Sequence, residues 1–477
     1  MKAGFFQLDI TPFIGMERPS GYRKAYADFI HDPTKVRSCI IEDGNEEVAI
    51  VVSDTLVSPP RENVIEIKEE IEKKVGIKKE NILIGATHTH SAGPLFFPFN
   101  YQDADPLTKK LISEYSTISD PFYYEIFKRK VVDSLICAEK KKEDVICNVG
   151  YGYEDKVSFN RRFKMKNNRV YTHPGKNNPD IIEPAGPIDH SVGVLTFWNK
   201  DKSPIGTFIN FACHLTTGPG GISADWLFYT EKIIKKIFED MDIILLQGAS
   251  GDITQVNNLS DRVDFGEKIS HFVGTRVGLE ALKIILTEEK GSLSPLKIKN
   301  KIINVKRRKQ SEEKLKMARE IVENGLKNEN IRQTTEWTFA KERIILDYLT
   351  KKQPEVEIEI QAIQIGPVII ISSPGEIFSS TGLKVKKASH FPITFFVELS
   401  NGFLGYIPDR KAFLPTGGGF ETVLTSESNL EVDAEEKIIE ESLKLMKEFK
   451  PGELPEYDKI TSKPQVWSYG ILGPDID

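Results

Sequence analysis

The sequence predicts an α/β protein with a mixed β-sheet core and flanking helices. Short apolar runs typical of buried strands alternate with segments whose apolar residues recur at helical spacing. One strand–helix–strand succession favours parallel pairing, and one pair of apolar runs around a short polar turn favours an antiparallel hairpin. Because both kinds of connection occur in one chain, we expect the sheet to be mixed.

The first elements form a strand–helix–strand unit. Residues 46–54, "EEVAIVVSD", predict a buried strand, residues 61–76 an amphipathic helix, and residues 81–87, "NILIGAT", a second strand. A further helix is expected over residues 121–142, where apolar side chains recur at helical spacing.

The middle of the chain predicts a hairpin followed by a helix and a strand. Residues 191–198, "SVGVLTFW", and residues 204–214, "PIGTFINFACH", flank the turn sequence "NKDKS". Residues 228–241 are expected to be helical, and residues 242–248, "DIILLQG", predict a short buried strand.

A charged helical insertion interrupts the strands of the second half. Charge density rises over residues 311–352 while apolar residues recur at helical spacing, between a strand at 297–306 and strands within 355–376. We expect this insertion to be a solvated cap and not a separate domain. A C-terminal helix is expected at about 431–449. No linker rich in Pro, Gly or Ser divides the chain, so residues 1–477 predict a single domain.

Composition excludes several classes of function. The 477 residues are 39% hydrophobic and 28% charged, as in globular proteins, and the net charge of −6 supplies no basic field for a nucleic acid. The first residues lack the apolar segment of a signal peptide, and no run approaches the roughly 20 apolar residues of a transmembrane segment. The four cysteines form no CxxC pair. We therefore expect a cytoplasmic protein; its oligomeric state is not predicted.

Two histidines follow a predicted strand directly. In "THTHS", His88 and His90 lie two residues apart, and in extended backbone such residues point to the same side. The two imidazoles can therefore converge on one site. Alone, this pair is equally consistent with surface or capping histidines.

The same position, a polar residue where an apolar strand meets a turn, recurs elsewhere. His214 ends the strand "NFACH", Glu376 follows "PVIIISS" in a Pro-Gly turn, and Tyr406 follows the strand at 393–402. Loops at strand ends are where α/β proteins build their sites. Histidine, glutamate and tyrosine supply the nitrogen and oxygen ligands that zinc takes, with one position left for water.

Eight short blocks occur along the chain between about Gly4 and Glu421. They are "LDITP", "HDPTKVRSCII", "ILIGATHTHSAGP", "SFNRRF", "INFACH", "QGASGDIT", "SSPGE" and "LSNGFLGYIPD". In combination and in this order they resemble the catalytic domain of the neutral/alkaline, non-lysosomal ceramidases and their shorter bacterial relatives. The resemblance implies hydrolysis of an amide bond in a small-molecule or lipid-like N-acyl substrate, with one zinc ion per chain.

The resemblance also implies roles for individual residues. It places four zinc ligands at His88, His214, Glu376 and Tyr406. It places His90 and Arg161 beside the zinc, in contact with substrate. Zinc lowers the pKa of bound water and polarises a carbonyl, while nearby donors stabilise the charge that develops on oxygen. His90 is expected to transfer the proton, because an imidazole titrates near neutral pH.

The chain departs from the family pattern in three places. Thr254, in "GDITQVN", stands where the family carries an active-site serine, and Phe403 stands where it often carries a tyrosine. Ser250, in "GASGD", lies outside a G-x-S-x-G elbow, so we expect attack by water in preference to Thr254, and Thr254 in preference to Ser250. The stretch after Tyr406 is too short for the family's C-terminal β-sandwich of roughly 100 residues.

These departures leave several functions open. The substrate is either ceramide-like or a more polar N-acyl compound. The alternatives are an esterase or lactonase, an N-deacetylase acting on a small polar or sugar substrate, and a non-catalytic binding protein that retains the metal site. Asp225 is expected either to orient a zinc ligand or to cap a helix. The glycine-rich "LPTGGGFE" is expected to be a mobile substrate loop.

Overall fold

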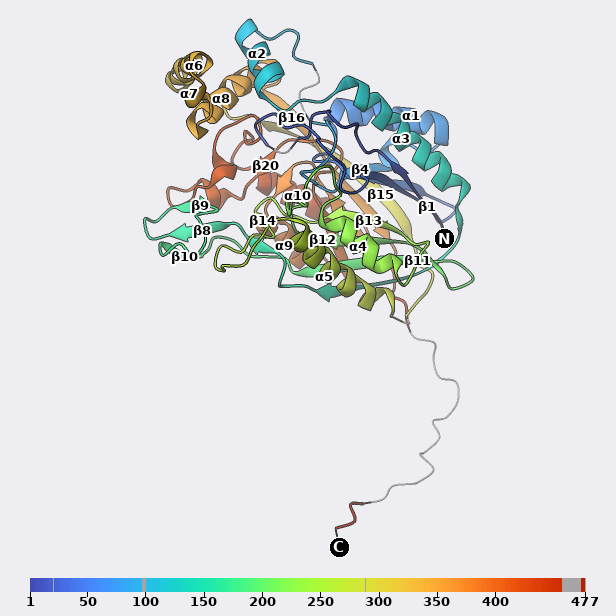
Figure 1. Cartoon of the computed structure of the whole chain (residues 1–477). Coiled ribbons are helices and arrows are strands. Elements are labelled where there is room, and N and C mark those ends of the chain that lie inside the picture. The colour runs from blue at the N-terminus through green and yellow to red at the C-terminus, as the bar shows by residue number, and fades with distance from the viewer. Residues whose placement is uncertain (20, 97–99, 288, 457–472, 477) are drawn as a thin grey trace.

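The structure is a computed structural model that describes residues 1–19, 21–96, 100–287, 289–456 and 473–476. The described residues form a mixed α/β fold with ten α-helices and several sheets, three of which form the core (Figure 1). No helix in these ranges combines the length and the apolar character needed to cross a membrane. The expected α/β class with a mixed core is confirmed.

The first sheet has the strand order β4-β3-β2-β1-β5. Its strands are β1 Lys2–Asp9, β2 Lys35–Glu42, β3 Glu47–Ser53, β4 Ile82–Ala86 and β5 Glu143–Asp144. Strands β3 and β4 pair in parallel through helix α1, Arg61–Val75, which confirms the expected strand–helix–strand unit. Helix α3, Pro121–Lys140, packs beside α1 on the same core.

The second sheet has the order β13-β12-β11-β6. Its strands are β6 Ile146–Tyr153, β11 Ser191–Trp198, β12 Pro204–Phe211 and β13 Asp242–Gln247. The expected hairpin is confirmed, because β11 and β12 pair antiparallel. Helices α4, Trp226–Lys235, and α5, Glu267–Ile285, cover this sheet. The expected helix at 228–241 is wrong at its end, because the chain turns after Lys235 to enter β13.

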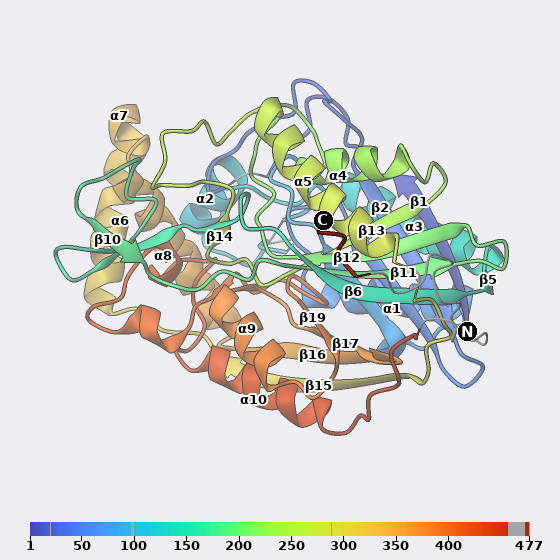
Figure 2. The same cartoon turned by 90° about the horizontal axis from the view of Figure 1, so that it is seen from below.

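The third sheet has the order β15-β16-β17-β19. Its strands are β15 Leu296–Lys306, β16 Glu355–Ile365, β17 Val368–Ser372 and β19 Ile393–Val397, and helices α9 Ser379–Ala388 and α10 Ala434–Met446 cover it. Seen from below, the second and third sheets lie between their two helical layers (Figure 2). One apolar core joins all three sheets, with Phe5, Ile244 and Phe395 from the first, second and third.

Small sheets lie near the ends of the large ones. They are β7 Phe159–Asn160 with β14 Ile253–Thr254, β18 Glu376–Ile377 with β20 Tyr406–Ile407, and the group β8 Arg162–Met165, β9 Val170–Thr172 and β10 Ile181–Pro184. Three short 3-10 helices are η1 Lys79–Asn81, η2 Arg410–Phe413 and η3 Phe420–Thr422. Most of the expected site residues lie in or beside these short elements.

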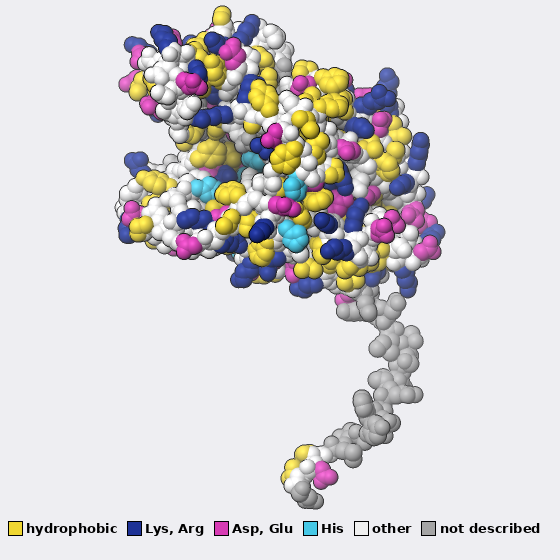
Figure 3. Space-filling view, in the orientation of Figure 1, with side chains coloured by type: hydrophobic (Ala, Val, Ile, Leu, Met, Phe, Trp, Pro, Cys, Tyr) yellow, Lys and Arg dark blue, Asp and Glu magenta, His cyan; other side chains and the backbone are white. Residues whose placement is uncertain are grey.

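The insertion, here called the cap, is helical, as expected. Its helices are α6 Glu312–Lys327, α7 Glu329–Arg332 and α8 Thr335–Lys352, and α2, Pro106–Tyr115, packs against them. The side chains of Ser311 and Thr334 accept hydrogen bonds from backbone N–H groups in the first turns of α6 and α8, which fixes where these helices begin. Figure 3 shows a hollow between this upper lobe and the lobe below it, with histidine side chains at its floor.

Candidate metal centre

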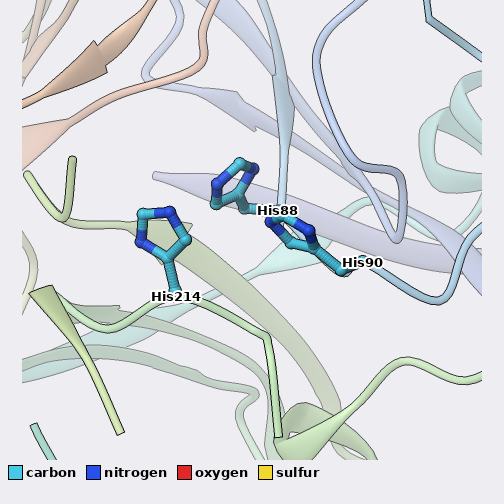
Figure 4. A group of neighbouring side chains, drawn as sticks. All are labelled: His88, His90 and His214. Carbon is cyan, nitrogen blue, oxygen red and sulfur yellow. The ribbon is translucent and has the colours of Figure 1, made fainter. Parts of the chain in front are cut away.

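His88 and His90 follow β4 and converge, but not for the expected reason. His88 has a φ of +72°, and its N–H donates to the Thr55 carbonyl at 3.0 Å, so the backbone is not extended there. The expectation of extended backbone is therefore wrong. The two rings still meet with centroids 4.9 Å apart, because the loop turns both of them toward one point (Figure 4).

His214 joins this pair from the neighbouring sheet. A parallel bridge between Thr89 and Leu215 ties the two histidine loops together, and the His90 N–H donates to the Leu215 carbonyl at 3.1 Å. The ring of His214 lies 4.4 Å from that of His88 and 5.9 Å from that of His90. One potential ligand atom from each of the three histidines lies within 4.8 Å of the others, so all three are candidate metal ligands.

Backbone carbonyls orient two of these rings. Nδ1 of His88 lies 2.7 Å from the Leu56 oxygen, and Nδ1 of His214 lies 2.9 Å from the Ile253 oxygen. A proton on each Nδ1 is thereby fixed, and Nε2 is left with its lone pair directed to the centre. Carbonyl oxygens behind the imidazoles are the usual arrangement of metal-binding histidines.

Glu376 reaches the same centre from β18, which follows strand β17 of the third sheet. The turn before it contains Gly375 at a φ of +95°, and the Glu376 N–H donates to the Gly405 carbonyl at 2.8 Å. Its Oε2 lies 3.2 Å from Nε2 of His88 and 3.3 Å from Nε2 of His214. Oε2 of Glu376 and Nε2 of His88 are buried and form no hydrogen bond, which is costly in an apolar interior and fits a bound cation.

The protonation states of these groups also fit a cation. Burial lowers the pKa of His214 to about 4, and the neighbouring His88 and Arg161 act in the same direction. Burial alone would raise the pKa of Glu376, but His88 and His214 outweigh it and hold that pKa well below its usual value. A neutral imidazole and an ionised carboxylate are the forms that bind zinc.

Tyr406 lies beside Glu376. The two residues are directly paired in the parallel strands β18 and β20, and paired residues project to the same face of a sheet. Burial and the charge of Glu376 raise the pKa of the Tyr406 phenol well above its usual value. The proposed role of Tyr406 as a ligand therefore stays a prediction.

Arg161 borders the centre on another side. Its Nη1 lies 3.3 Å from Nε2 of His214, and its Nη2 donates to the Gly251 carbonyl at 2.8 Å. Its guanidinium lies 5.4 Å from the ring centroid of Tyr406. This buried cation therefore lies beside two of the candidate ligands.

Glu421 is a site residue that the sequence did not reveal. It is fully buried, and its carboxylate accepts a 2.7 Å hydrogen bond from Arg161 Nε and another of 2.7 Å from the Thr172 hydroxyl. It belongs to "LPTGGGFE", where the Gly418 carbonyl also accepts from Arg162 Nη2 at 2.7 Å. The loop therefore holds Arg161 in place, and a single acidic residue after three glycines gives too weak a signal to predict this.

Thr254 lies in β14, next to the carbonyl that orients His214. Its hydroxyl donates to Gln255 Oε1 at 2.9 Å and lies 3.4 Å from the Thr216 hydroxyl. It is almost fully buried. These contacts match a structural hydroxyl, and its role in the reaction stays a prediction.

Ser250 is held in a polar network behind Glu376. Its hydroxyl donates to Glu398 at 2.5 Å, and the other oxygen of Glu398 accepts from the Ile377 N–H at 2.6 Å. The next residue, Gly251, packs so closely that a Cβ would lie 2.6 Å from the Glu376 carbonyl oxygen. The segment "GASGD" therefore fixes the backbone that carries Glu376.

Asp225 caps a helix. Its carboxylate accepts from the backbone N–H of Trp226 at 2.8 Å and from the Thr217 hydroxyl at 2.5 Å. Nδ1 of His214 donates to a carbonyl instead, so Asp225 shapes the loop after His214 and does not orient its ring.

Comparisons with known proteins agree with this arrangement at the level of fold. No protein-family model matches the chain, and no curated protein matches its sequence. The solved structure of the neutral ceramidase from Pseudomonas aeruginosa superposes with a TM-score of 0.67 at 16% identity, covering 95% of this chain and 76% of that one. A ceramidase complexed with C2 gives the same TM-score and identity over 98% of this chain and 78% of that one. The chain therefore has a neutral ceramidase-like fold.

Proposed function

We propose that this protein is a zinc-dependent hydrolase of an amide bond in an N-acyl substrate. The observation that carries the proposal is that three potential ligand atoms converge. Oε2 of Glu376 lies 3.2 Å from Nε2 of His88 and 3.3 Å from Nε2 of His214. Two of these atoms, Nε2 of His88 and Oε2 of Glu376, are buried without hydrogen bonds and would be stabilised by a cation, and zinc takes this set of ligands.

The zinc would be held by His88, His214, Glu376 and Tyr406. Bound there, it would supply the Lewis acidity that activates water and polarises the scissile carbonyl. The chain itself orients the ligands, through the carbonyls of Leu56 and Ile253 behind the two imidazoles.

Arg161 and His90 would act on the reacting groups. Although burial alone lowers the pKa of Arg161, Tyr406 and Glu421 raise it, so the guanidinium stays charged and can donate to an oxygen that gains negative charge. His90 is only partly buried, so its ring can exchange a proton with the substrate and with solvent.

Two further features of the protein belong to the same proposal. The chain would act as one domain over residues 1–477, with the helical cap as part of it, and it would act in the cytoplasm. The amide substrate would be either lipid-like or a more polar N-acyl compound.

Metal analysis of the purified protein tests the proposal. We expect one zinc per chain, lost in His88→Ala and in His214→Ala because each removes a nitrogen ligand. His390→Ala is the matched control, since that ring bonds the Phe449 carbonyl and does not belong to the histidine cluster, so the zinc content should stay unchanged. Full zinc content in His88→Ala and His214→Ala would refute the assignment.

Kinetic variants test the chemistry separately. His90→Ala and Arg161→Ala should lower kcat for an N-acyl substrate by about 100- to 1000-fold while zinc is retained, the usual range for one proton-transfer group or one donor to a developing oxyanion. Loss of zinc in His90→Ala would make His90 a ligand. Unchanged kcat in both variants, or hydrolysis of esters but not of amides, would contradict the proposed reaction.

A further inference from the structure

The cap is joined to the third sheet by two short links, one of which carries a run of basic residues. The first link, residues 307–311, leads from β15 into α6, and the second, residues 353–354, leads from α8 into β16. The sequence "KRRK" begins at Lys306, the last residue of β15. The links lie side by side, because the Arg307 N–H donates to the Pro354 carbonyl at 2.9 Å. We call these two links the cap base.

Two arginines of the cap base, Arg307 and Arg308, bond only neutral groups. Nε of Arg307 donates to the Gln353 carbonyl at 3.1 Å, and its Nη1 donates to the Asn429 side chain. Nη2 of Arg308 donates to the Ser428 carbonyl at 3.0 Å and lies 3.5 Å from the Ser428 hydroxyl. Nε of Arg308 is buried without a hydrogen bond. Within the described ranges, no acidic side chain forms an ion pair with either guanidinium.

The fully buried arginines of this protein are paired differently. The guanidiniums of Arg37, Arg161 and Arg162 each lie within 3.6 Å of a carboxylate oxygen. At the cap base no such charge opposes burial, which lowers the pKa of Arg307 and of Arg308 to about 10 each. Two partly buried positive charges without a negative partner are costly, and an anion placed between them offsets that cost.

The acidic side chains near the cap base have other surroundings. Glu431 accepts from the Lys306 N–H at 3.0 Å and pairs with Lys437 at 2.7 Å. Glu312 and Glu313, in the first turn of α6, are exposed to solvent. The positive charge of the cap base is therefore available to a ligand.

Each of the two guanidiniums also keeps one nitrogen for a ligand. Nη2 of Arg307 and Nη1 of Arg308 form no hydrogen bond with any part of the chain that the structure describes, and neither nitrogen is enclosed by protein. Both side chains reach neighbouring residues, Ser428 and Asn429, so the two free nitrogens lie over one segment. Guanidinium nitrogens bind phosphate oxygens through strong, charge-assisted hydrogen bonds.

The segment that both arginines contact also supports the candidate metal centre. The Ser428 hydroxyl donates to the Glu421 carbonyl, and the Glu427 carbonyl accepts from the Tyr406 N–H at 2.7 Å. The Glu421 carboxylate in turn accepts from Arg161 Nε at 2.7 Å. An anion at the cap base would therefore steady the segment on which Tyr406 and Arg161 depend.

We propose that Arg307 and Arg308 form a binding site for a phosphate group at the cap base. The group is either free phosphate or the phosphate of a small organic molecule, since both present oxygens with a charge of about −1.5 to −2 at neutral pH. Its binding pairs two positive charges that have no acidic partner and joins the cap to residues 425–430. The site is separate from the candidate metal centre and does not depend on the proposed hydrolysis.

Calorimetry with inorganic phosphate at constant ionic strength tests the site. We expect saturable binding with a Kd of about 1 mM or below, and Arg308→Met should weaken it at least about tenfold because it removes a charged donor. Arg129→Met is the matched control, since it removes a guanidinium that is 82% exposed on α3. Phosphate binding that is absent from the original protein, or unchanged in Arg308→Met, would refute the site.

Two further variants keep the test decisive. Arg308→Lys retains the charge but not the forked donor, so it should fold even where Arg308→Met does not, and it should still bind phosphate more weakly than the original protein. His88→Ala should bind phosphate as the original protein does, because the cap base lies outside the metal centre. Loss of binding in His88→Ala together with unchanged binding in Arg308→Lys would place the phosphate at the metal centre and overturn the proposal.

The source of the phosphate group is distinguished by a second titration, with phenyl phosphate. Tighter binding of phenyl phosphate than of inorganic phosphate, lost in Arg308→Lys, would support the site and identify an organic phosphate as its ligand. Tighter binding of inorganic phosphate, with the same loss, would support the site and identify the free ion.

Discussion

Two buried polar clusters in this protein contain the same kinds of groups and differ in how they are paired. In the first sheet, Arg37 donates to Asp54 at 3.1 Å and to Glu231 at 2.8 Å, and every nitrogen of its guanidinium has an acceptor. At the candidate metal centre, Nε2 of His88 and Oε2 of Glu376 lie 3.2 Å apart without a hydrogen bond. One cluster is complete as it stands, and the other leaves two buried polar atoms that a cation would pair.

The difference separates a structural role from a functional one. Burial of charge is tolerated only when its partners are present, so the complete Arg37 cluster contributes to the folded state by itself. The centre around Glu376 holds two buried polar atoms without hydrogen bonds, a costly arrangement that a bound cation would offset. The two clusters differ in whether each buried polar atom has a hydrogen-bond partner, and not in burial or residue type.

The largest expected effect is the loss of the Arg37 cluster. Arg37→Met leaves Asp54 and Glu231 buried without their shared cation and should lower the free energy of unfolding by about 3–5 kcal/mol with zinc content unchanged. Glu376→Gln should do the opposite, losing zinc while the metal-free protein unfolds with nearly unchanged free energy. Denaturant unfolding and metal analysis of both variants measure this, and a zinc loss in Arg37→Met would erase the distinction.

The same cluster should also determine part of the acid sensitivity. Burial raises the pKa of Glu231, but Arg37 and Lys35 outweigh it and hold that pKa far below its usual value. A lowered carboxyl pKa gives stability that is present above the unfolded-state pKa of about 4.3 and is lost as the pH falls below it. Stability should therefore fall less steeply below about pH 4 in Arg37→Met than in the original protein.

A smaller effect, on kcat/KM, is expected at Glu421, which pairs with Arg161 at the border of the candidate metal centre. Glu421 and Arg161 form a complete buried ion pair, but Arg161 also lies 3.3 Å from His214. Glu421→Gln should therefore act through Arg161, with a coupling between Glu421→Gln and Arg161→Met of about 0.5–3 kcal/mol in kcat/KM. Additive effects in this double-mutant cycle would show that Glu421 does not position Arg161.

The smallest effect is expected at Thr254. Its hydroxyl bonds only neutral groups, so Thr254→Ser should be nearly neutral and Thr254→Ala should cost about 1 kcal/mol in kcat/KM. Gln255 Oε1 keeps the Thr216 hydroxyl as a donor at 2.8 Å, which limits the loss. An acyl adduct on Thr254 in the intact mass of the protein, or complete loss of activity in Thr254→Ala, would make it a nucleophile and not a structural hydroxyl.

The core strands and most helices could be predicted from local patterns. Apolar runs such as 242–248 and helical periodicity such as 61–76 depend on neighbouring residues only, so these elements were expected close to their observed bounds. Helices α2, α5 and α9 and strand β6 were not among the expected elements. The end of α4 was missed because the turn after Lys235 follows from the position of β13, which the local pattern does not contain. Strands β1 and β2 carried no local signal as clear as that of β3.

The sequence by itself determined which residues are candidates for the centre. His88, His214 and Glu376 each follow an apolar strand at a turn, and that is a property of short stretches of chain. Only the tertiary structure decided that they meet, because they come from three different sheets. It also decided that Asp225 caps a helix. The pairing of Glu421 with Arg161, 260 residues away in the chain, likewise depends on the tertiary structure. Hydrogen bonds and charges act over a few ångströms in space, and distance along the sequence does not reveal which groups come that close.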